Sequence, residues 1–221
     1  MKYIGIDISV NSTAVCIYDN KHNLYNYTTK KSNYVWIKNT SDIINFKFFD
    51  FEYKKIDGFS DTLIEKIKDY DKYTEEIIND IKLYGNEFII GIEGYNYGLK
   101  TTDSIIDISE LSSILKLKLL REFPNSKIIL IPPKSVKIDS CKMVYNLIDG
   151  QKVVRNNIGV AGGSFDKIDM LNAFLESNIQ NDLKNYLISK KDDILKMKNI
   201  PKPFDDVIDS IFIMEIVKNN I

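Results

Sequence analysis

The 221-residue sequence has little cysteine, little proline and no long apolar run. Its two cysteines, Cys16 and Cys141, stand in no CxxC or CxxH pattern. They predict neither a disulfide framework nor a zinc site, and we read both as structural residues of a protein from a reducing compartment. No apolar stretch reaches the roughly 18 residues that a membrane helix needs. Because the first residues show no signal-peptide pattern either, we expect a cytoplasmic protein without a membrane span.

Net charge is also nearly absent. The chain has 30 Lys and Arg residues against 31 Asp and Glu residues, which gives a net charge of −1. This balance does not by itself indicate nucleic-acid binding, but a local basic patch would still permit it. The only histidine, His22, falls in a predicted turn, and we expect it to be solvated rather than a metal ligand.

Apolar runs and turn residues predict the order βββαβαβα. The first three strands are joined by short turns and should form an antiparallel meander. The fourth is apolar almost throughout, as in a strand buried on both faces. The expected elements are strands at 2–9, 12–19, 23–30, 87–94 and 126–133 and helices at 60–84, 105–123 and 207–217.

Two segments have no clear pattern. Residues 32–58 are rich in aromatic side chains and leave further strands open at 34–38 and 45–53. Residues 138–163 show little periodicity and are expected to be irregular.

The order of elements indicates an α/β fold, a five-stranded mixed sheet flanked by helices on both faces. We expect one domain over 1–221 with an insertion around 32–84. The apolar stripe of the first helix is read as core; it consists of Leu63, Ile64, Ile67, Tyr70, Ile77, Ile78 and Ile81.

Four carboxylates interrupt the apolar elements. Asp7 follows "YIGI" in the first strand, Glu93 follows "IIGI" in the fourth, and Asp206 and Asp209 lie three residues apart on one side of the last helix. Each also has a structural reading, as a strand end, a loop cap or a helix N-cap. If they converge, they would take up protons unless a cation neutralised them. Oxygen ligands without His or Cys favour Mg²⁺ or Mn²⁺, and a two-metal site of this kind cleaves phosphodiesters.

The segments "IGIDISVNSTAVCI", "IGIEGYNYG" and "DDVIDSIFI" together resemble the RuvC family of Holliday junction resolvases, in the versions carried by phages and large DNA viruses. The resemblance implies an RNase H-like fold and a catalytic, metal-binding set matched by Asp7, Glu93, Asp206 and Asp209. It implies two Mg²⁺ ions per active site, with Mn²⁺ able to substitute. Asp205 would change the spacing of the last pair to four residues, so Asp206 is preferred.

DNA contacts are expected from lysines and tyrosines near these carboxylates. The segments "PPKSVK" and "FDKIDML" resemble family segments with DNA-contacting lysines, which assigns that role to Lys137 and Lys167. Lys134 belongs to a basic excess over 134–155 that suits phosphates. Tyr95 and Tyr97 follow Glu93 closely, where their rings either stack on unpaired bases or pack at the strand end.

The predicted function is therefore a metal-dependent endonuclease that resolves four-way junctions and related branched DNA by paired nicks. A junction has two-fold symmetry, so we expect a homodimer. An apolar stripe on helix 105–123 supplies either the dimer interface, as the resemblance implies, or core; it consists of Ile108, Leu111, Leu115 and Leu119. The alternatives are an RNase H or terminase-type nuclease, or a non-catalytic nucleic-acid-binding scaffold. An actin-like ATPase is disfavoured because "DISVNST" lacks the glycine of a phosphate loop.

Overall fold

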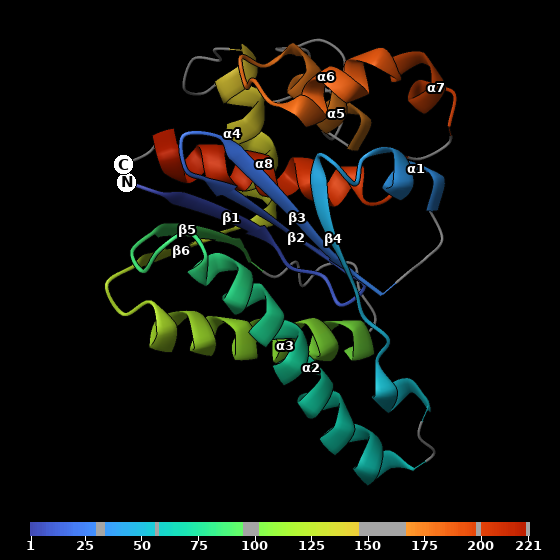
Figure 1. Cartoon of the computed structure of the whole chain (residues 1–221), viewed down its shortest axis with the longest axis vertical. Helices are drawn as coiled ribbons and strands as arrows, with labels where there is room; N and C mark the ends of the chain where they lie inside the picture. The colour runs from blue at the N-terminus through green and yellow to red at the C-terminus, as the bar shows by residue number, and fades with distance from the viewer. Residues whose placement is uncertain (30–33, 56–57, 95–101, 146–166, 198–199, 220–221) are drawn as a thin grey trace.

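The computed structural model describes residues 1–29, 34–55, 58–94, 102–145, 167–197 and 200–219. Within them, six strands form one mixed sheet in the order β4-β3-β2-β1-β5-β6 (Figure 1). The strands are β1 (Tyr3–Asp7), β2 (Ser12–Tyr18), β3 (His22–Thr28), β4 (Ile44–Phe48), β5 (Ile89–Glu93) and β6 (Lys127–Ile131). The helices are α1 (Tyr34–Asn39), α2 (Phe59–Lys82), α3 (Thr102–Glu122), α4 (Pro133–Tyr145), α5 (Lys167–Glu176), α6 (Asp182–Ser189), α7 (Lys191–Leu195) and α8 (Phe204–Asn219), with a 3-10 helix, η1 (Glu52–Lys55).

Strands β1, β2 and β3 pair antiparallel, and β1, β5 and β6 pair parallel. The predicted meander and the mixed sheet with helices on both faces are therefore confirmed. The sheet has one strand more than expected, because β4 adds in parallel beside β3 at one edge. This strand lies in the segment 32–58, where 34–38 was the other strand candidate. That candidate is wrong, since 34–38 lies in α1.

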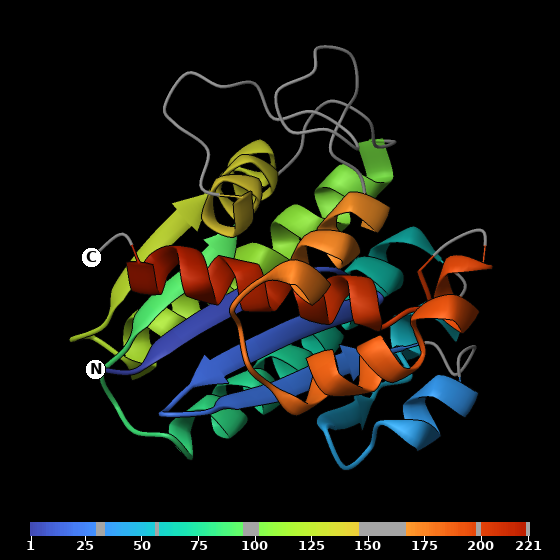
Figure 2. The same cartoon turned by 90° about the horizontal axis from the view of Figure 1, so that it is seen from above.

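The two faces of the sheet are covered by different helices (Figures 1 and 2). Helices α2 and α3 lie on one face, whereas α8, α4, α5 and α6 lie on the other. Side chains alternate along a strand, so Ile4 and Ile6 of β1 face the first pair of helices, where they meet the buried rings of Tyr70 and Tyr73. Gly5, between them, faces α8. The core is thus divided into two apolar clusters by the sheet.

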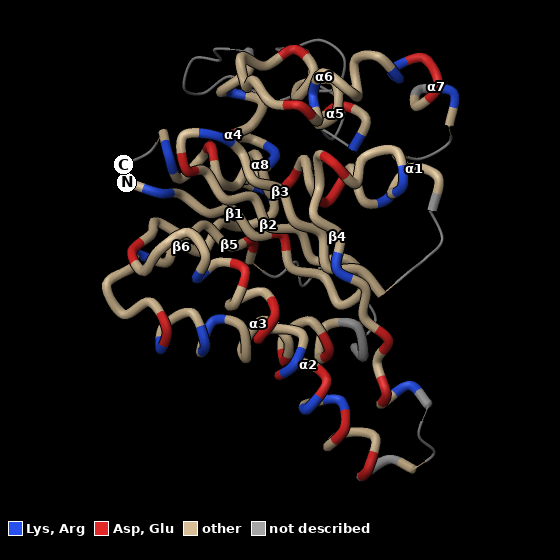
Figure 3. The backbone as a smooth tube through the Cα atoms, in the orientation of Figure 1, with Lys and Arg blue, Asp and Glu red and all other residues tan. Residues whose placement is uncertain are grey.

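The α3 stripe belongs to the core. Leu111, Leu115 and Leu119 are at most 1% exposed and pack in the cluster between α2, α3 and the sheet. This burial favours the core reading of the stripe over the dimer-interface reading. Charges of both signs are distributed along α2 and α3 (Figure 3).

The α2 stripe is only partly core. Its second half is buried, but the first turns extend beyond the sheet, as the lower end of α2 in Figure 1 shows. The prediction of a fully buried stripe was wrong for Leu63, Ile64 and Ile67, which are 38–53% exposed. Residues 138–145 were expected to be irregular and instead belong to α4.

The single histidine is not solvated. His22 opens β3, its side chain is 6% exposed, and its Nε2 lies 3.1 Å from Glu215 Oε1 of α8. Cys16 and Cys141 are both buried free thiols. Among the described helices, none combines the length and the apolar character that spanning a membrane requires.

Candidate metal and DNA site

Two glycines let α8 approach the centre of the sheet. Gly5 of β1 and Gly91 of β5 stand opposite each other in the parallel register. A Cβ atom on Gly5 would overlap the Ser210 carbonyl oxygen and lie 2.8 Å from Met214 Cβ, and one on Gly91 would lie 2.8 Å from Ile213 Cγ2. The glycines in "YIGI" and "IIGI" therefore fix how closely α8 crosses β1 and β5.

The same glycines determine where two of the carboxylates point. Asp7 follows Gly5 by two residues and Glu93 follows Gly91 by two residues, so both side chains leave the sheet on the α8 face. Both residues end their strands, and the carboxyl ends of β1 and β5 meet at one edge because the strands are parallel. The structure thus brings Asp7 and Glu93 together.

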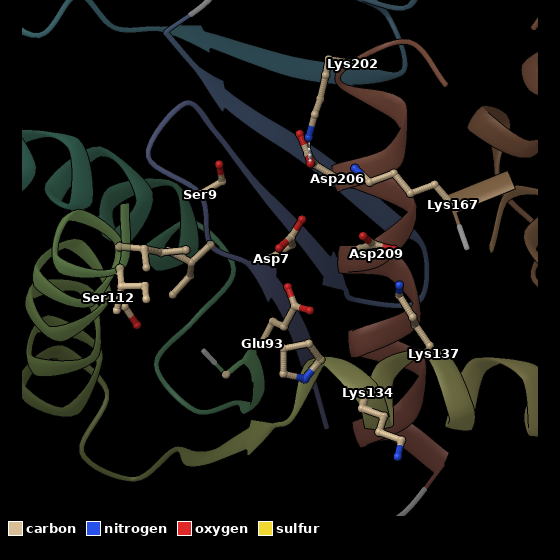
Figure 4. Close-up of a pocket in the computed structure, with 15 residues that line it drawn as sticks. Asp7, Ser9, Glu93, Ser112, Lys134, Lys137, Lys167, Lys202, Asp206 and Asp209 are labelled. Carbon is tan, nitrogen blue, oxygen red and sulfur yellow. Dashed lines mark hydrogen bonds and ion pairs between the residues drawn. The ribbon is translucent and has the colours of Figure 1, made fainter. Parts of the chain in front are cut away.

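The first turns of α8 complete the acidic group. Asp209 lies near Asp7 and Glu93, and Asp206, one turn earlier on α8, has its carboxylate turned toward Lys202 (Figure 4). All four line one cavity of about 460 Å³ between the sheet edge, α3, α4 and α8. Its lining residues are Asp7, Ile8, Ser9, Glu93, Gly94, Ile105, Ile108, Ser112, Pro133, Lys134, Lys137, Lys167, Lys202, Asp206 and Asp209.

The positive charge near the carboxylates is too small for all of them to remain ionised together. Burial, and then the neighbouring Glu93, Asp206 and Asp209, raise the pKa of Asp7 well above its usual value. Burial followed by Glu93 raises the pKa of Asp209 to about 8, although Lys167 opposes the shift. Burial and Asp205 raise the pKa of Asp206, against the effect of Lys202. The group therefore favours a bound cation or protons.

Two lysines contact the acidic end of α8. Lys202, just before the helix, forms ion pairs with Asp206 and, at 3.1 Å, with Asp205 Oδ2. Lys167, at the start of α5, pairs with Asp205. Burial alone would lower the pKa of Lys202, but Asp206 and Asp205 hold it above its usual value. Sequence reasoning missed Lys202 and the role of Asp205. Lys202 precedes Asp205 by three residues and Asp206 by four, and this spacing was the available signal.

The residues fit a divalent cation in donor type and charge. All four acids offer oxygen ligands, and the Oδ2 atom of Asp206 is buried with no hydrogen-bond partner among the described residues. Within those residues, no three His, Cys, Asp or Glu side chains yet lie close enough to form a ready coordination shell. The other carboxylate oxygen of Asp206 accepts a hydrogen bond from Lys202 (Figure 4).

The predicted DNA-contacting lysines surround the cavity. Lys134 and Lys137 lie on the first turns of α4, and Lys167 begins α5. All three are exposed, and Lys137 points toward Asp209 in Figure 4. The structure therefore brings these lysines to the same cavity as the carboxylates. Tyr95 and Tyr97 lie outside the described residues.

No protein-family model matches the chain, and no curated protein matches it. Solved structures similar to it include the yeast mitochondrial Holliday junction resolvase, at 14% identity over 98% of this chain and 80% of that chain, with a TM-score of 0.44. The structure of Thermus thermophilus RuvC is similar at 10% identity over 99% of this chain and 96% of that chain, with a TM-score of 0.45. The same protein in complex with Holliday junction substrate is similar at 9% identity over 99% of this chain and 95% of that chain, also with a TM-score of 0.45. These values are too low to transfer a residue's role or a substrate to this chain.

Proposed function

We propose that the protein is a metal-dependent DNA endonuclease of the RNase H-like type that cuts branched DNA. One observation carries the proposal: Asp7 and Glu93 end two neighbouring parallel strands on the face that α8 covers, and Asp206 and Asp209 meet them from that helix. Buried acids in this number are costly unless they are neutralised. A structural role for each acid separately would not require them to share one cavity.

Asp7, Glu93, Asp206 and Asp209 would hold two Mg²⁺ ions, or Mn²⁺ in their place. Such ions supply a hydroxide-like nucleophile and stabilise the leaving oxygen of a phosphodiester. The chain's own part is to fix the acids on two strand ends and a helix, which are rigid elements. Lys134, Lys137 and Lys167 surround the opening and would neutralise the phosphates on either side of the cut.

Four-way junctions are the proposed substrate because the sequence motifs around Asp7, Glu93 and Asp209 resemble those of RuvC-family resolvases. A homodimer with two sites related by two-fold symmetry would match the symmetry of the junction and produce paired nicks. RNase H and terminase-type nucleases use the same kind of acidic site, so the substrate is the part that the experiment must decide.

Cleavage of a matched substrate set tests the proposal. Labelled four-way junction, Y-fork, linear duplex and RNA–DNA hybrid would be incubated with the protein in Mg²⁺ or Mn²⁺, with the Asp7→Asn variant as the control for contaminating nucleases. Symmetric paired nicks in the junction, with binding but no cutting in chelator, are expected. Preferred cutting of the hybrid would instead establish an RNase H, and binding without cutting in any metal would establish a scaffold.

A further inference from the structure

The acidic cavity already contains a cation of the chain's own. Lys202 reaches from the segment before α8 to the Asp206 carboxylate, and its amino group also lies 3.1 Å from Asp205 Oδ2 (Figure 4). The Lys202 side chain is 48% exposed, whereas those of Asp205 and Asp206 are 4% and 6% exposed. A half-exposed lysine side chain thus neutralises two buried acids.

Two oxygen atoms near this ammonium group lack partners. Within the described residues, Asp205 Oδ1 and Asp206 Oδ2 are buried and accept no hydrogen bond. Asp206 lines the cavity with the other three acids, but Asp205 does not. The two neighbouring acids therefore have different surroundings. Asp206 pairs with Lys202 and also lines the cavity, whereas Asp205 pairs with Lys202 and Lys167 and does not line it.

We propose that Lys202 is a displaceable counter-ion, which occupies Asp206 until a divalent metal ion takes its place and which Asp205 then retains. The inference rests on the proposed function, because it requires the acidic cavity to bind a metal. Lys202 need not leave the site, since Asp205 already contacts its amino group and has a free oxygen to offer. The displaced charge stays beside the cavity, where a phosphate of the substrate would enter.

The chain contains its own reporter of this exchange. Trp36, its only tryptophan, packs edge-to-face on the ring of Phe204 with ring centroids 5.6 Å apart. Phe204 begins α8 and directly precedes Asp205 in the sequence. A change in the contacts of Lys202 and Asp206 should therefore alter Trp36 fluorescence without an added label.

The test measures Mg²⁺ affinity in the intact protein, without DNA, by Trp36 fluorescence and by calorimetry. Lys202→Met removes the competitor, so the dissociation constant for Mg²⁺ should fall by about fivefold, which corresponds to about 1 kcal/mol. Lys202→Gln is measured in parallel in case the first variant folds poorly. Lys134→Met is the matched control, because Lys134 lines the same cavity but forms no ion pair with a described residue. It should change the constant by less than about twofold, because the substitution removes a positive charge near the cavity without freeing a carboxylate.

The outcomes distinguish the proposed metal site from the proposed counter-ion role of Lys202. Equal or weaker Mg²⁺ binding by both Lys202 variants would overturn the counter-ion role, even if their melting temperatures fall. An equal gain in Lys134→Met would overturn it too, because the effect would then be general electrostatics. Mg²⁺ binding by the wild type with no response to Lys202 leaves the metal site standing, whereas no binding in any variant overturns the metal site and the inference together.

Discussion

The two ends of α8 both carry buried acids, and they differ in how those acids are balanced. At the carboxyl end, Glu215 is 6% exposed, lies 3.1 Å from His22 Nε2 and is paired with Lys218 at 3.3 Å. Burial alone would raise the pKa of Glu215, but His22 and Lys218 hold it below its usual value. This acid remains charged because the chain itself supplies its partners.

At the amino end, the balance is reversed. Asp7, Asp206 and Asp209 have raised pKa values, with burial as the largest cause in each and acidic neighbours adding to it. Both ends border cavities of similar size, about 460 and 510 Å³. Cavity volume therefore does not distinguish the two ends of α8, whereas the balance of charge around their acids does.

The largest expected effect comes from neutralising one acid at the amino end of α8, with an acid at the carboxyl end as the control. Asp7→Asn should reduce junction cleavage by at least about a thousandfold, or about 4 kcal/mol, and should leave junction binding equal or tighter. Asp206→Asn and Asp209→Asn should do the same. Glu215→Gln is the matched control: it should lower the melting temperature, because His22 and Lys218 lose their charged partner, but keep cleavage within about threefold. Cleavage at the wild-type rate would remove the altered aspartate from the proposed site.

The close packing of α8 on the sheet can be tested at Gly5 and Gly91. Gly5→Ala should destabilise the fold by about 1–3 kcal/mol and reduce cleavage, because the new methyl group meets backbone atoms of Ser210 and Met214 that cannot move alone. Gly91→Ala should cost less, since its closest atoms are side-chain methyl groups of Ile213 and Val217. Chemical unfolding and cleavage rates measure both. A larger loss in Gly91→Ala would show that α8 is not positioned by Gly5.

The sequence predicts the acids at the amino end of α8 better than the ion pairs at its carboxyl end. Apolar runs ending in Asp7 and Glu93 locate strand ends, and a strand's side-chain alternation then gives the direction of both acids. In contrast, the pair between His22 and Glu215 joins residues 193 positions apart, and no local pattern encodes such a contact.

One local signal was interpreted wrongly, and another left two readings open. The prolines after β6 end that strand, but Pro133 also opens α4, where a missing backbone N–H costs nothing. Residues 138–145 continue this helix. The edge strand β4 is half exposed and therefore lacks a continuous apolar run, so its pattern in the aromatic segment was ambiguous.

A smaller effect is expected at the lysines around the cavity. The double change Lys137→Ala and Lys167→Ala should weaken junction binding by roughly tenfold to a hundredfold at low salt and reduce its salt dependence, because fewer counterions are released. Lys167 should contribute less, since Asp205 already neutralises part of its charge. Lys218→Ala, at the other end of α8, should leave binding unchanged. Binding that does not vary between about 50 and 200 mM salt would contradict a phosphate-contacting role.

The smallest effect expected is a loss of stability between pH 6 and 9, which the amino end of α8 should produce and the carboxyl end should not. The pKa of Asp209 is about 8 in the folded protein, against about 3.9 for an unfolded aspartate, so the folded state binds its proton more tightly. Its contribution to stability is complete below about pH 4 and is lost as the pH rises through about 8. The lowered pKa of Glu215 has the opposite sign: its contribution is present above its unfolded pKa and is lost only when the pH falls through its folded pKa, in the acidic range.

Between pH 6 and 9, the melting temperature of the protein in chelator should therefore fall by a few degrees. Saturating Mg²⁺ should remove most of this slope, because a bound cation stabilises the ionised carboxylates in place of protons. Asp209→Asn should flatten the slope in chelator, whereas Glu215→Gln should lower every melting temperature and keep the slope. If the slope persists unchanged in Mg²⁺, or if Glu215→Gln removes it, the unbalanced charge lies elsewhere than in the cavity that Asp7, Glu93, Asp206 and Asp209 share.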